Sequence, residues 1–224
     1  MRTLQEHINL SVVIPTLNAA ATLVDCLAAL GSHEVIVVDG GSDDATIALA
    51  EAHGARAIPA PRGRGQQLAA GARAATGDWL LFLHADCRLD PAWQLAITAF
   101  GDDPGRAGYF DLALDDPAPA ARRVERLVAW RSRTFGLPYG DQGLLISRAL
   151  YDAVGGYAEI PLMEDVDLAR RLGRKRLAPI GATVTASARR YRDGGYIRRP
   201  LRNLCCLSLY FAGMPPHRIA RLYG

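Results

Sequence analysis

Two potential metal ligands, His84 and Asp86, stand two residues apart at the end of the apolar run 79–84. Side chains two positions apart in an extended chain point to the same side. Imidazole and carboxylate ligands from one short segment can hold Mn²⁺ or Mg²⁺ against a diphosphate. The alternative is structural: Asp86 caps the turn after the strand, and His84 packs in the core.

Two adjacent acids, Glu164 and Asp165, begin a predicted helix in a part of the chain that is otherwise basic. The helix dipole favours acids in a first turn, which is a sufficient structural reason for their presence. A carboxylate at this position can also act as a general base if it reaches a nucleophilic hydroxyl. The residues alone leave both interpretations open.

Polar loops with glycines follow or precede two predicted strands, at residues 39–44 (DGGSDD) and 139–143 (YGDQG). In the first loop the glycines permit a tight turn, and Ser42 can cap the next helix. Alternatively, the backbone at Gly41 and Ser42 admits a ligand while Asp39 accepts hydrogen bonds from a base or ribose. The second loop is typical of a binding loop and equally of a turn.

The elements that must position these residues alternate between two periodicities. Runs that are apolar throughout predict strands covered on both faces, at residues 10–15, 34–39, 55–59 and 79–84. Helical spacing lies between them, at residues 19–30, 43–53 and 66–76. This alternation favours an α/β fold whose mostly parallel sheet carries helices on both faces. Because ligands bind beyond the carboxyl ends of parallel strands, we expect the polar strand ends to share one site.

The alternation weakens after residue 100. We expect strands at 108–114 and 143–146, and helices at 118–133, 148–154, 165–172 and 197–211. The sequence shows no repeat and no linker, so we expect one domain over residues 1–224. Its nucleotide-binding half would end near residue 100, and its acceptor half, from about 101 to 224, would end in basic helices.

Composition and charge exclude several classes of protein. The chain has 224 residues, of which 50% are hydrophobic and 22% charged, a globular composition. It has no apolar run long enough to span a membrane. Residues 164–224 carry thirteen basic and four acidic side chains, which suggests contact with phosphates or an anionic membrane. Aromatic residues are not interleaved among these charges, so nucleic acid is not an expected partner.

The location is expected to be cytoplasmic, with the basic end peripheral to the inner face of a membrane. The first ten residues lack the apolar core of a secretory signal. The four cysteines have no C-x-x-C spacing and indicate neither a zinc site nor a disulfide framework. The run Leu-Cys-Cys-Leu-Ser-Leu-Tyr-Phe at 204–211 can lie on a membrane, or close the core, or form a dimer surface.

Four motifs follow one another in order: VVIPTLNAA (12–20), VVDGGSDDAT (37–46), GDWLLFLHADC (77–87) and MEDVDLARRL (163–172). Together they resemble the family 2 glycosyltransferases, inverting enzymes of the GT-A fold that use nucleotide-sugar donors. The HAD motif in place of the usual D-x-D, with the YGDQG loop and the short length, resembles a small bacterial subgroup labelled "glycosyltransferase-like family 2". The resemblance covers residues 10 to 172.

This resemblance implies a divalent metal, Mn²⁺ or Mg²⁺, and a set of site residues. Asp86, with His84 beside it, would ligate the metal that holds the donor diphosphate. Asp165, or else Glu164, would deprotonate the acceptor hydroxyl. The donor nucleotide and its diphosphate would be bound by Pro15, Thr16, Asn18, Asp39, Gly41, Ser42, Arg64, Gly65, Asp86, Arg189, Arg190 and Arg192. The acceptor, which can be lipid-linked, is not identified by the sequence.

The sequence departs from the family pattern at two places. His84 occupies the first D-x-D position, and a neutral imidazole brings no negative charge to a metal. The segment 189–192, RRYR, stands where many relatives have an R-W pair. Two other classes therefore stay open: a nucleotidyltransferase, and a non-catalytic nucleotide-sugar-binding protein on a decayed transferase fold. The first normally has a glycine-rich basic loop after its first strand, and here that position is Thr-Leu-Asn-Ala (16–19).

Overall fold

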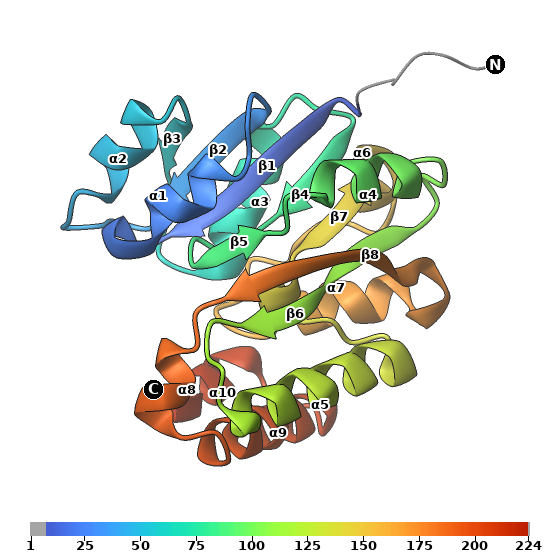
Figure 1. Cartoon of the computed structure of the whole chain (residues 1–224). Coiled ribbons are helices and arrows are strands. Elements are labelled where there is room, and N and C mark those ends of the chain that lie inside the picture. Colours follow the sequence, from blue (N-terminus) through green and yellow to red (C-terminus); the bar gives the residue numbers. More distant parts are fainter. Residues whose placement is uncertain (1–7, 224) are drawn as a thin grey trace.

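One eight-stranded sheet runs through the structure, with the strand order β3-β2-β1-β4-β7-β6-β8-β5 (Figure 1). The structure, a computed structural model, describes residues 8–223. The first seven residues, on which the expectation about a secretory signal partly rests, lie outside that range. The strands are β1 Leu10–Thr16, β2 Glu34–Asp39, β3 Arg56–Pro59, β4 Trp79–Phe82, β5 Cys87–Leu89, β6 Ala107–Leu114, β7 Leu144–Ser147 and β8 Leu177–Ala186.

The parallel part of the sheet consists of β3, β2, β1 and β4. Each residue of β1 is buried, because helices cover both faces of this strand. Val12 and Ile14 pack toward one core cluster, and Val13 toward the other, as the alternation of side chains along a strand requires. The uniformly apolar runs therefore mark doubly covered strands, and the predicted α/β class is confirmed.

The helices divide between the two faces. Helices α1, α2, α4 and α5 contribute buried residues to one core cluster, and α3, α6, α7 and α9 to the other. The helices are α1 Ala20–Ala28, α2 Thr46–Ala52, α3 Arg64–Ala74, α4 Trp93–Phe100, α5 Pro119–Phe135, α6 Arg148–Ala153, α7 Glu164–Leu172, α8 Arg189–Gly194, α9 Arg198–Phe211 and α10 Pro216–Tyr223, with short 3₁₀ turns at Gly140–Gln142 and Arg174–Arg176.

The second half of the sheet is mixed. Strand β7 is antiparallel to both β4 and β6, and β5 is antiparallel to β8. Strands β6 and β8 are parallel, with a register shift between Tyr109 and Asp111. Six of the eight strands therefore run in one direction, so the sheet is mostly parallel as predicted.

Five elements were not predicted: β5, α4, β8, α8 and α10. Strand β8 is the central omission, because it forms the longest pairing of the second half, with β6. Its sequence contains Pro179 and Gly181, which are ordinarily signals against a strand interior. Strand β5 has only three residues, and the sequence of α8 consists mostly of charged residues.

The HAD segment lies beyond β4 rather than within it. Strand β4 ends at Phe82, where the sequence predicts extended chain to residue 84. The amide of Leu83 still donates to Val13 O, and the chain then turns so that the amide of Cys87 donates to His84 O. The prediction that His84 and Asp86 share one side of an extended strand was wrong, since both lie in this turn.

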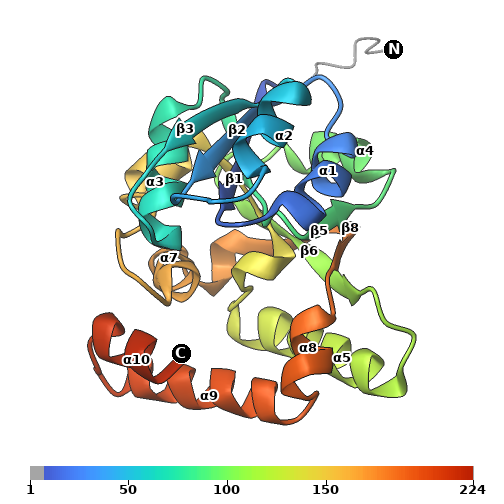
Figure 2. The ribbon, with the colours of Figure 1, turned by 90° about the vertical axis from the view of Figure 1, so that its left-hand side faces the viewer.

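The C-terminal helices form a layer beyond the sheet. Figure 2 shows α9 and α10 next to each other at one end of the molecule, with α8 and α5 beside them. Buried Cys206, Leu207 and Ile219 anchor this layer to the core cluster that also contains α7. Among residues 8–223, no helix combines the length and the apolar character needed to cross a bilayer.

Candidate active site

Two pockets meet at the carboxyl end of β4. The wide pocket has a cavity volume of about 450 Å³ and lies between the β1–α1 loop, the start of α3 and the HAD turn. The narrow pocket, of about 100 Å³, lies between the HAD turn, the start of α7 and the C-terminal helices. Residues lining both pockets are Arg64, His84, Asp86, Ser187 and Arg190. A ligand in one pocket is thus in reach of a ligand in the other.

The β1–α1 loop forms one wall of the wide pocket, with Pro15, Thr16 and Asn18 in its lining. Asn18 has a left-handed backbone with φ 51°, a conformation that asparagine tolerates better than most residues. Its amide donates to Ser42 Oγ at 2.8 Å, and its side-chain Oδ1 accepts from the amide of Asp43 at 2.9 Å. The DGGSDD loop therefore supports this wall from behind.

Asp39 is buried, and its carboxylate stabilises the DGGSDD loop. Its carboxylate accepts hydrogen bonds from the amides of Gly41 and Ser42, at 2.9 and 2.7 Å, and from Ser42 Oγ at 2.5 Å. Thr16 Oγ1 donates a fourth, at 3.0 Å. Burial opposes ionisation, but the hydrogen bonds from Ser42, Gly41 and Thr16 hold the pKa of Asp39 below its ordinary value. Asp39, Gly41 and Ser42 line neither pocket, and their contact with a nucleotide stays a prediction.

Helix α3 begins at the mouth of the wide pocket and is fixed there by two close contacts. Gln67, which the sequence analysis did not single out, donates from Nε2 to Thr16 O at 2.7 Å and to Val38 O at 2.8 Å. A Cβ at Gly65 would lie 2.3 Å from Ala158 O, so only glycine permits this approach. Gly65 is therefore a packing residue beneath the site, outside the lining of both pockets.

His84 and Asp86 face both pockets, as the metal hypothesis requires. Burial and the nearby Arg64 guanidinium lower the pKa of His84 to about 4, so the imidazole is neutral at physiological pH. The YGDQG turn packs against this ring: a Cβ at Gly140 would lie 2.6 Å from His84 Nε2. Within residues 8–223, no group of three or more His, Cys, Asp or Glu side chains is arranged to hold a metal. Among the described residues, the HAD turn therefore offers one Asp and one His to a metal.

Asp165 and Glu164 have different surroundings although they are adjacent. Asp165 lines the narrow pocket, and its Oδ2 accepts from the amide of Gly140 at 2.9 Å. Glu164 is only 1% exposed and lines neither pocket. Its Oε1 pairs with Arg64 Nε at 3.1 Å, and Oε2 is buried without a hydrogen-bond partner in the described chain.

The charges around Glu164 are strongly coupled. Burial raises the pKa of Glu164 to about 7; the Arg64 guanidinium opposes this effect and Asp165 adds to it. Burial would lower the pKa of Arg64, but Glu164 and Asp165 raise it above its ordinary value. The accessible carboxylate is thus Asp165, and Glu164 holds Arg64 at the junction of the two pockets.

The far wall of the narrow pocket comes from the YGDQG turn and the C-terminal helices. Asp141 Oδ1 and Asn203 Oδ1 are buried in this lining without a hydrogen-bond partner among the described residues. Burial raises the pKa of Asp141, with Arg131 opposing and Asp165 adding to the effect. The YGDQG turn was a predicted candidate, whereas four other lining residues were not predicted: Tyr191, Arg199, Asn203 and Tyr223. No spacing rule connects these residues to the HAD motif, since tertiary packing brings them together.

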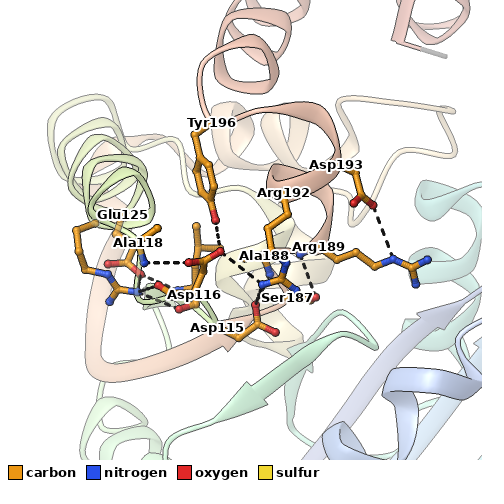
Figure 3. A network of polar contacts seen from close by, with 12 residues as sticks. Asp115, Asp116, Ala118, Glu125, Ser187, Ala188, Arg189, Arg192, Asp193 and Tyr196 are labelled. Carbon is orange, nitrogen blue, oxygen red and sulfur yellow. Dashed lines mark hydrogen bonds and ion pairs between the residues drawn. The ribbon is translucent and has the colours of Figure 1, made fainter.

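The three arginines of α8 separate into two groups. Arg190 lines both pockets and Arg189 lines the wide pocket; their binding of a diphosphate stays a prediction. Arg192 lines neither: it pairs with Asp115 Oδ1 at 3.4 Å and Asp116 Oδ2 at 3.6 Å (Figure 3).

The same two acids fix the start of α8. Asp115 Oδ1 accepts from the amide of Ala188 at 2.5 Å, and Asp116 Oδ2 accepts from Tyr196 Oη at 2.7 Å. The β6–α5 loop therefore clamps the start of α8 (Figure 3). Arg190, which lines both pockets, belongs to this clamped helix.

The structure thus brings most of the predicted site residues to one place. Those at the two pockets are Pro15, Thr16, Asn18, Arg64, His84, Asp86, Asp165, Arg189 and Arg190. The others support them from outside the lining: Asp39, Gly41, Ser42, Gly65, Glu164 and Arg192. A negatively charged ligand portion fits the junction, where arginines outnumber carboxylates, and a group with hydrogen-bond donors fits the narrow pocket.

Residues 11–127 match the family model described as Glycosyl transferase family 2. Among curated proteins, a "PGL/p-HBAD biosynthesis glycosyltransferase" of Mycobacterium bovis strain BCG is 41% identical over 165 residues, which cover 66% of this chain and 62% of the relative. A protein with the same description from Mycobacterium tuberculosis strain H37Ra matches equally well. The chain thus spans about 62% of the length of these relatives.

Solved structures share the fold at low sequence identity. S. aureus TarS has a TM-score of 0.63 at 16% identity, covering 89% of this chain and 39% of TarS. The mannosyltransferase PcManGT from Pyrobaculum calidifontis, in complex with GDP-Man and Mn²⁺, has a TM-score of 0.62 at 18% identity, covering 81% of this chain and 57% of that one. Mannosyl-3-phosphoglycerate synthase from Rubrobacter xylanophilus has a TM-score of 0.59 at 22% identity, covering 92% and 76%. The fold is GT-A.

Proposed function

Because the chain belongs to glycosyl transferase family 2, we propose that it transfers a sugar from a nucleotide-sugar donor to an acceptor hydroxyl with inversion. The observation that carries the proposal is the meeting of two pockets at Arg64, His84, Asp86 and Arg190. A donor in the wide pocket and an acceptor in the narrow pocket would have their reacting atoms at this junction. Substrates held so close need no covalent intermediate on the protein.

The wide pocket is the proposed donor site. Its volume lies in the ordinary range for sites that bind small molecules, about 300–1,000 Å³. PcManGT is described in complex with GDP-Man and TarS in complex with UDP-GlcNAc, which supports a nucleotide sugar here. Residues up to about 100 then form the nucleotide-binding half, and residues from about 101 to 224 the acceptor half of one domain.

Asp86, with neutral His84 beside it, would hold Mn²⁺ or Mg²⁺ at the junction. Mg²⁺ is typically bound by one or two carboxylates together with substrate phosphates and waters, so this small ligand set fits. A bound divalent ion would neutralise charge on the leaving diphosphate. Arg190 and Arg189 add fixed positive charge on the same side, and Asp115 and Asp116 keep α8 in place for that purpose.

Asp165 is the proposed general base. It is the carboxylate of the Glu164–Asp165 pair that faces the narrow pocket, and the amide of Gly140 fixes its orientation. It would accept the proton of the acceptor hydroxyl as that oxygen attacks the sugar from the side opposite the diphosphate. Glu164 is a positioning residue that holds Arg64.

The narrow pocket has room only for the reacting end of an acceptor. Asp141 Oδ1 and Asn203 Oδ1 would accept hydrogen bonds from acceptor hydroxyls, which satisfies two buried atoms that otherwise have no described partner. We propose a lipid-linked acceptor and a cytoplasmic location at the inner face of the membrane. Two observations support that setting. The relatives are described as PGL/p-HBAD biosynthesis glycosyltransferases, and the four cysteines of this chain are free thiols.

Asp165→Asn tests the proposed chemistry. We expect the rate of labelled sugar transfer from the donor to a bacterial lipid extract to fall about 10²- to 10⁴-fold, because the amide cannot take a proton. Binding of the nucleoside diphosphate should stay unchanged, since that ligand occupies the wide pocket. Asp152→Asn, at an exposed position on α6, is the matched control. Transfer by Asp165→Asn within twofold of the parent rate would contradict the assignment.

A further inference from the structure

Large apolar side chains are exposed mainly at one end of the molecule. Ten such side chains are exposed among residues 8–223, and eight of them belong to α5, α9, α10 or the residue before α9. They are Leu127, Trp130, Phe135, Ile197, Leu201, Leu204, Phe211 and Leu222. Scattered exposed apolar residues are normal, but a concentration on neighbouring helices marks a contact surface.

Helix α9 carries the most regular part of this surface. Ile197, Leu201, Leu204 and Phe211 are 74%, 58%, 57% and 51% exposed. Their spacings of four, three and seven residues place them on one face of the helix. We call these four side chains the outer strip. An apolar strip of this length along the solvent side of a helix marks a contact surface.

The opposite side of α9 faces the protein. Cys206 is buried there, and Arg199 and Asn203 line the narrow pocket. The narrow pocket and the outer strip are therefore two sides of one helix, separated by about the 10 Å diameter of a helix with its side chains. Whatever binds the outer strip lies next to the proposed acceptor site.

The charge of the segment selects among possible partners. Residues 194–224 contain five arginines and no aspartate or glutamate. Arg198 and Arg202 are exposed beside the outer strip. Pairing of α9 with a second copy of itself would bring together two basic segments that have no acid to pair with these arginines. An anionic lipid surface instead offers both negative headgroups and apolar chains, the combination that binds interfacial amphipathic helices.

We propose that the outer strip of α9 lies on an anionic bilayer, with Arg198 and Arg202 at the headgroups and the narrow pocket on the protein side of the same helix. The proposal deepens the proposed function and rests on it for the acceptor: a lipid-linked hydroxyl would enter the pocket from the bilayer surface. The surface itself is argued only from the exposure and charge of α9.

Vesicle co-sedimentation of the full chain tests this proposal. We expect binding to mixed phosphatidylglycerol–phosphatidylcholine vesicles at low ionic strength, and much weaker binding to pure phosphatidylcholine vesicles. Leu201→Ser with Leu204→Ser should lower the partition coefficient at least about 10-fold, because two apolar anchors are lost. Arg198→Gln with Arg202→Gln should lower it about 25-fold, or about 5-fold for each arginine.

Ile47→Ser with Leu95→Ser is the matched control, because these exposed residues belong to α2 and α4, away from the C-terminal layer (Figure 1). This variant should bind vesicles like the parent chain. The substituted leucine and isoleucine side chains are exposed, so those variants should keep the parent melting temperature. The Arg202 guanidinium lies 4.5 Å from the centroid of the Tyr223 ring, so the melting temperature of the arginine variant is measured together with its vesicle binding.

Three results would overturn the proposal: no binding of the parent chain to the anionic vesicles, equal binding by the Leu201→Ser, Leu204→Ser variant, or a dimer in sedimentation velocity that this variant dissociates. Binding of nucleoside diphosphates, measured without vesicles, reports separately on the proposed function. If the chain binds nucleoside diphosphates but not the vesicles, the membrane proposal fails. If it binds the vesicles but not nucleoside diphosphates, the proposed function fails.

Discussion

Replacing Glu164 with glutamine removes a buried carboxylate whose ionisation opposes folding. Burial raises the pKa of Glu164 from 4.5 to about 7. Between these two pH values the unfolded chain releases the proton while the folded chain keeps it. The free energy of unfolding therefore falls as pH rises through this range, by about 1.4 kcal/mol for each pH unit and by about 3 kcal/mol in total.

Glutamine cannot ionise, so the free energy of unfolding of the Glu164→Gln variant does not fall in this way as pH rises. The difference in unfolding free energy between variant and parent should increase by about 2.5 kcal/mol in favour of the variant from pH 5 to pH 8. For a chain of this size, that change corresponds to about 5–10 °C in melting temperature. Groups remote from Glu164, which titrate alike in both proteins, cancel in the difference.

Thermal and urea unfolding at several pH values between 5 and 8 would measure this effect. Glu159→Gln, at an exposed glutamate paired with Arg73, shows how much any Glu-to-Gln change contributes. A Glu164→Gln difference that does not vary with pH would refute the reasoning, because it would mean that the carboxylate ionises as freely in the fold as in the unfolded chain.

Two further substitutions separate residues that look alike in the sequence. Arg190→Gln should weaken nucleoside diphosphate binding in calorimetric titrations about 10-fold or more, because a charged hydrogen bond is lost, whereas Arg192→Gln should leave it nearly unchanged. Equal effects of the two would contradict the assigned orientation of α8. Gly65→Ala should lower the free energy of unfolding by about 1–3 kcal/mol, since its Cβ would meet Ala158 O at 2.3 Å. Gly194→Ala, with no atom within 4 Å of its Cβ, should unfold like the parent in urea; a comparable loss there would show that the contact at Gly65 is not the cause.

The parallel half of the sheet was predictable because its signals are local. A strand covered on both faces is mostly apolar. Strand β4 is apolar throughout, and in β1 and β2 the only polar residues are Ser11, Thr16, Glu34 and Asp39. Strand β8 was missed because its identity depends on pairing with β6, about seventy residues earlier, and not on its own sequence. Its proline and glycine are tolerated because the partner strand fixes the chain.

The same contrast holds at the site. Residues at the strand ends and at the start of α7 carry motif signals, so Thr16, Asp86 and Asp165 were found from the sequence. Asn203 and Tyr223 reach the narrow pocket only through the packing of the C-terminal helices, which no spacing encodes.

The arginines of segment 189–192 also show what could not be predicted from the sequence alone. In the sequence they are equivalent, but positions 190 and 192 are about half a helical turn apart, so Arg190 points into the site and Arg192 toward Asp115. Asp39 is the opposite case. The sequence predicts that Asp39 contacts a ligand, but all its described hydrogen bonds are to residues of its own loop and of β1.

The most direct test of the account is a thermal-shift screen of nucleoside diphosphates and nucleotide sugars, each with Mn²⁺, Mg²⁺ or EDTA. A ligand at 100 times its Kd stabilises the folded chain by about 2.7 kcal/mol, which corresponds to about 5–11 °C. We predict such a shift for one nucleotide base in the presence of metal, its reduction by EDTA and its loss in Asp86→Ala. The absence of a shift with every nucleotide, with and without metal, would contradict the donor site and with it the proposed transfer reaction.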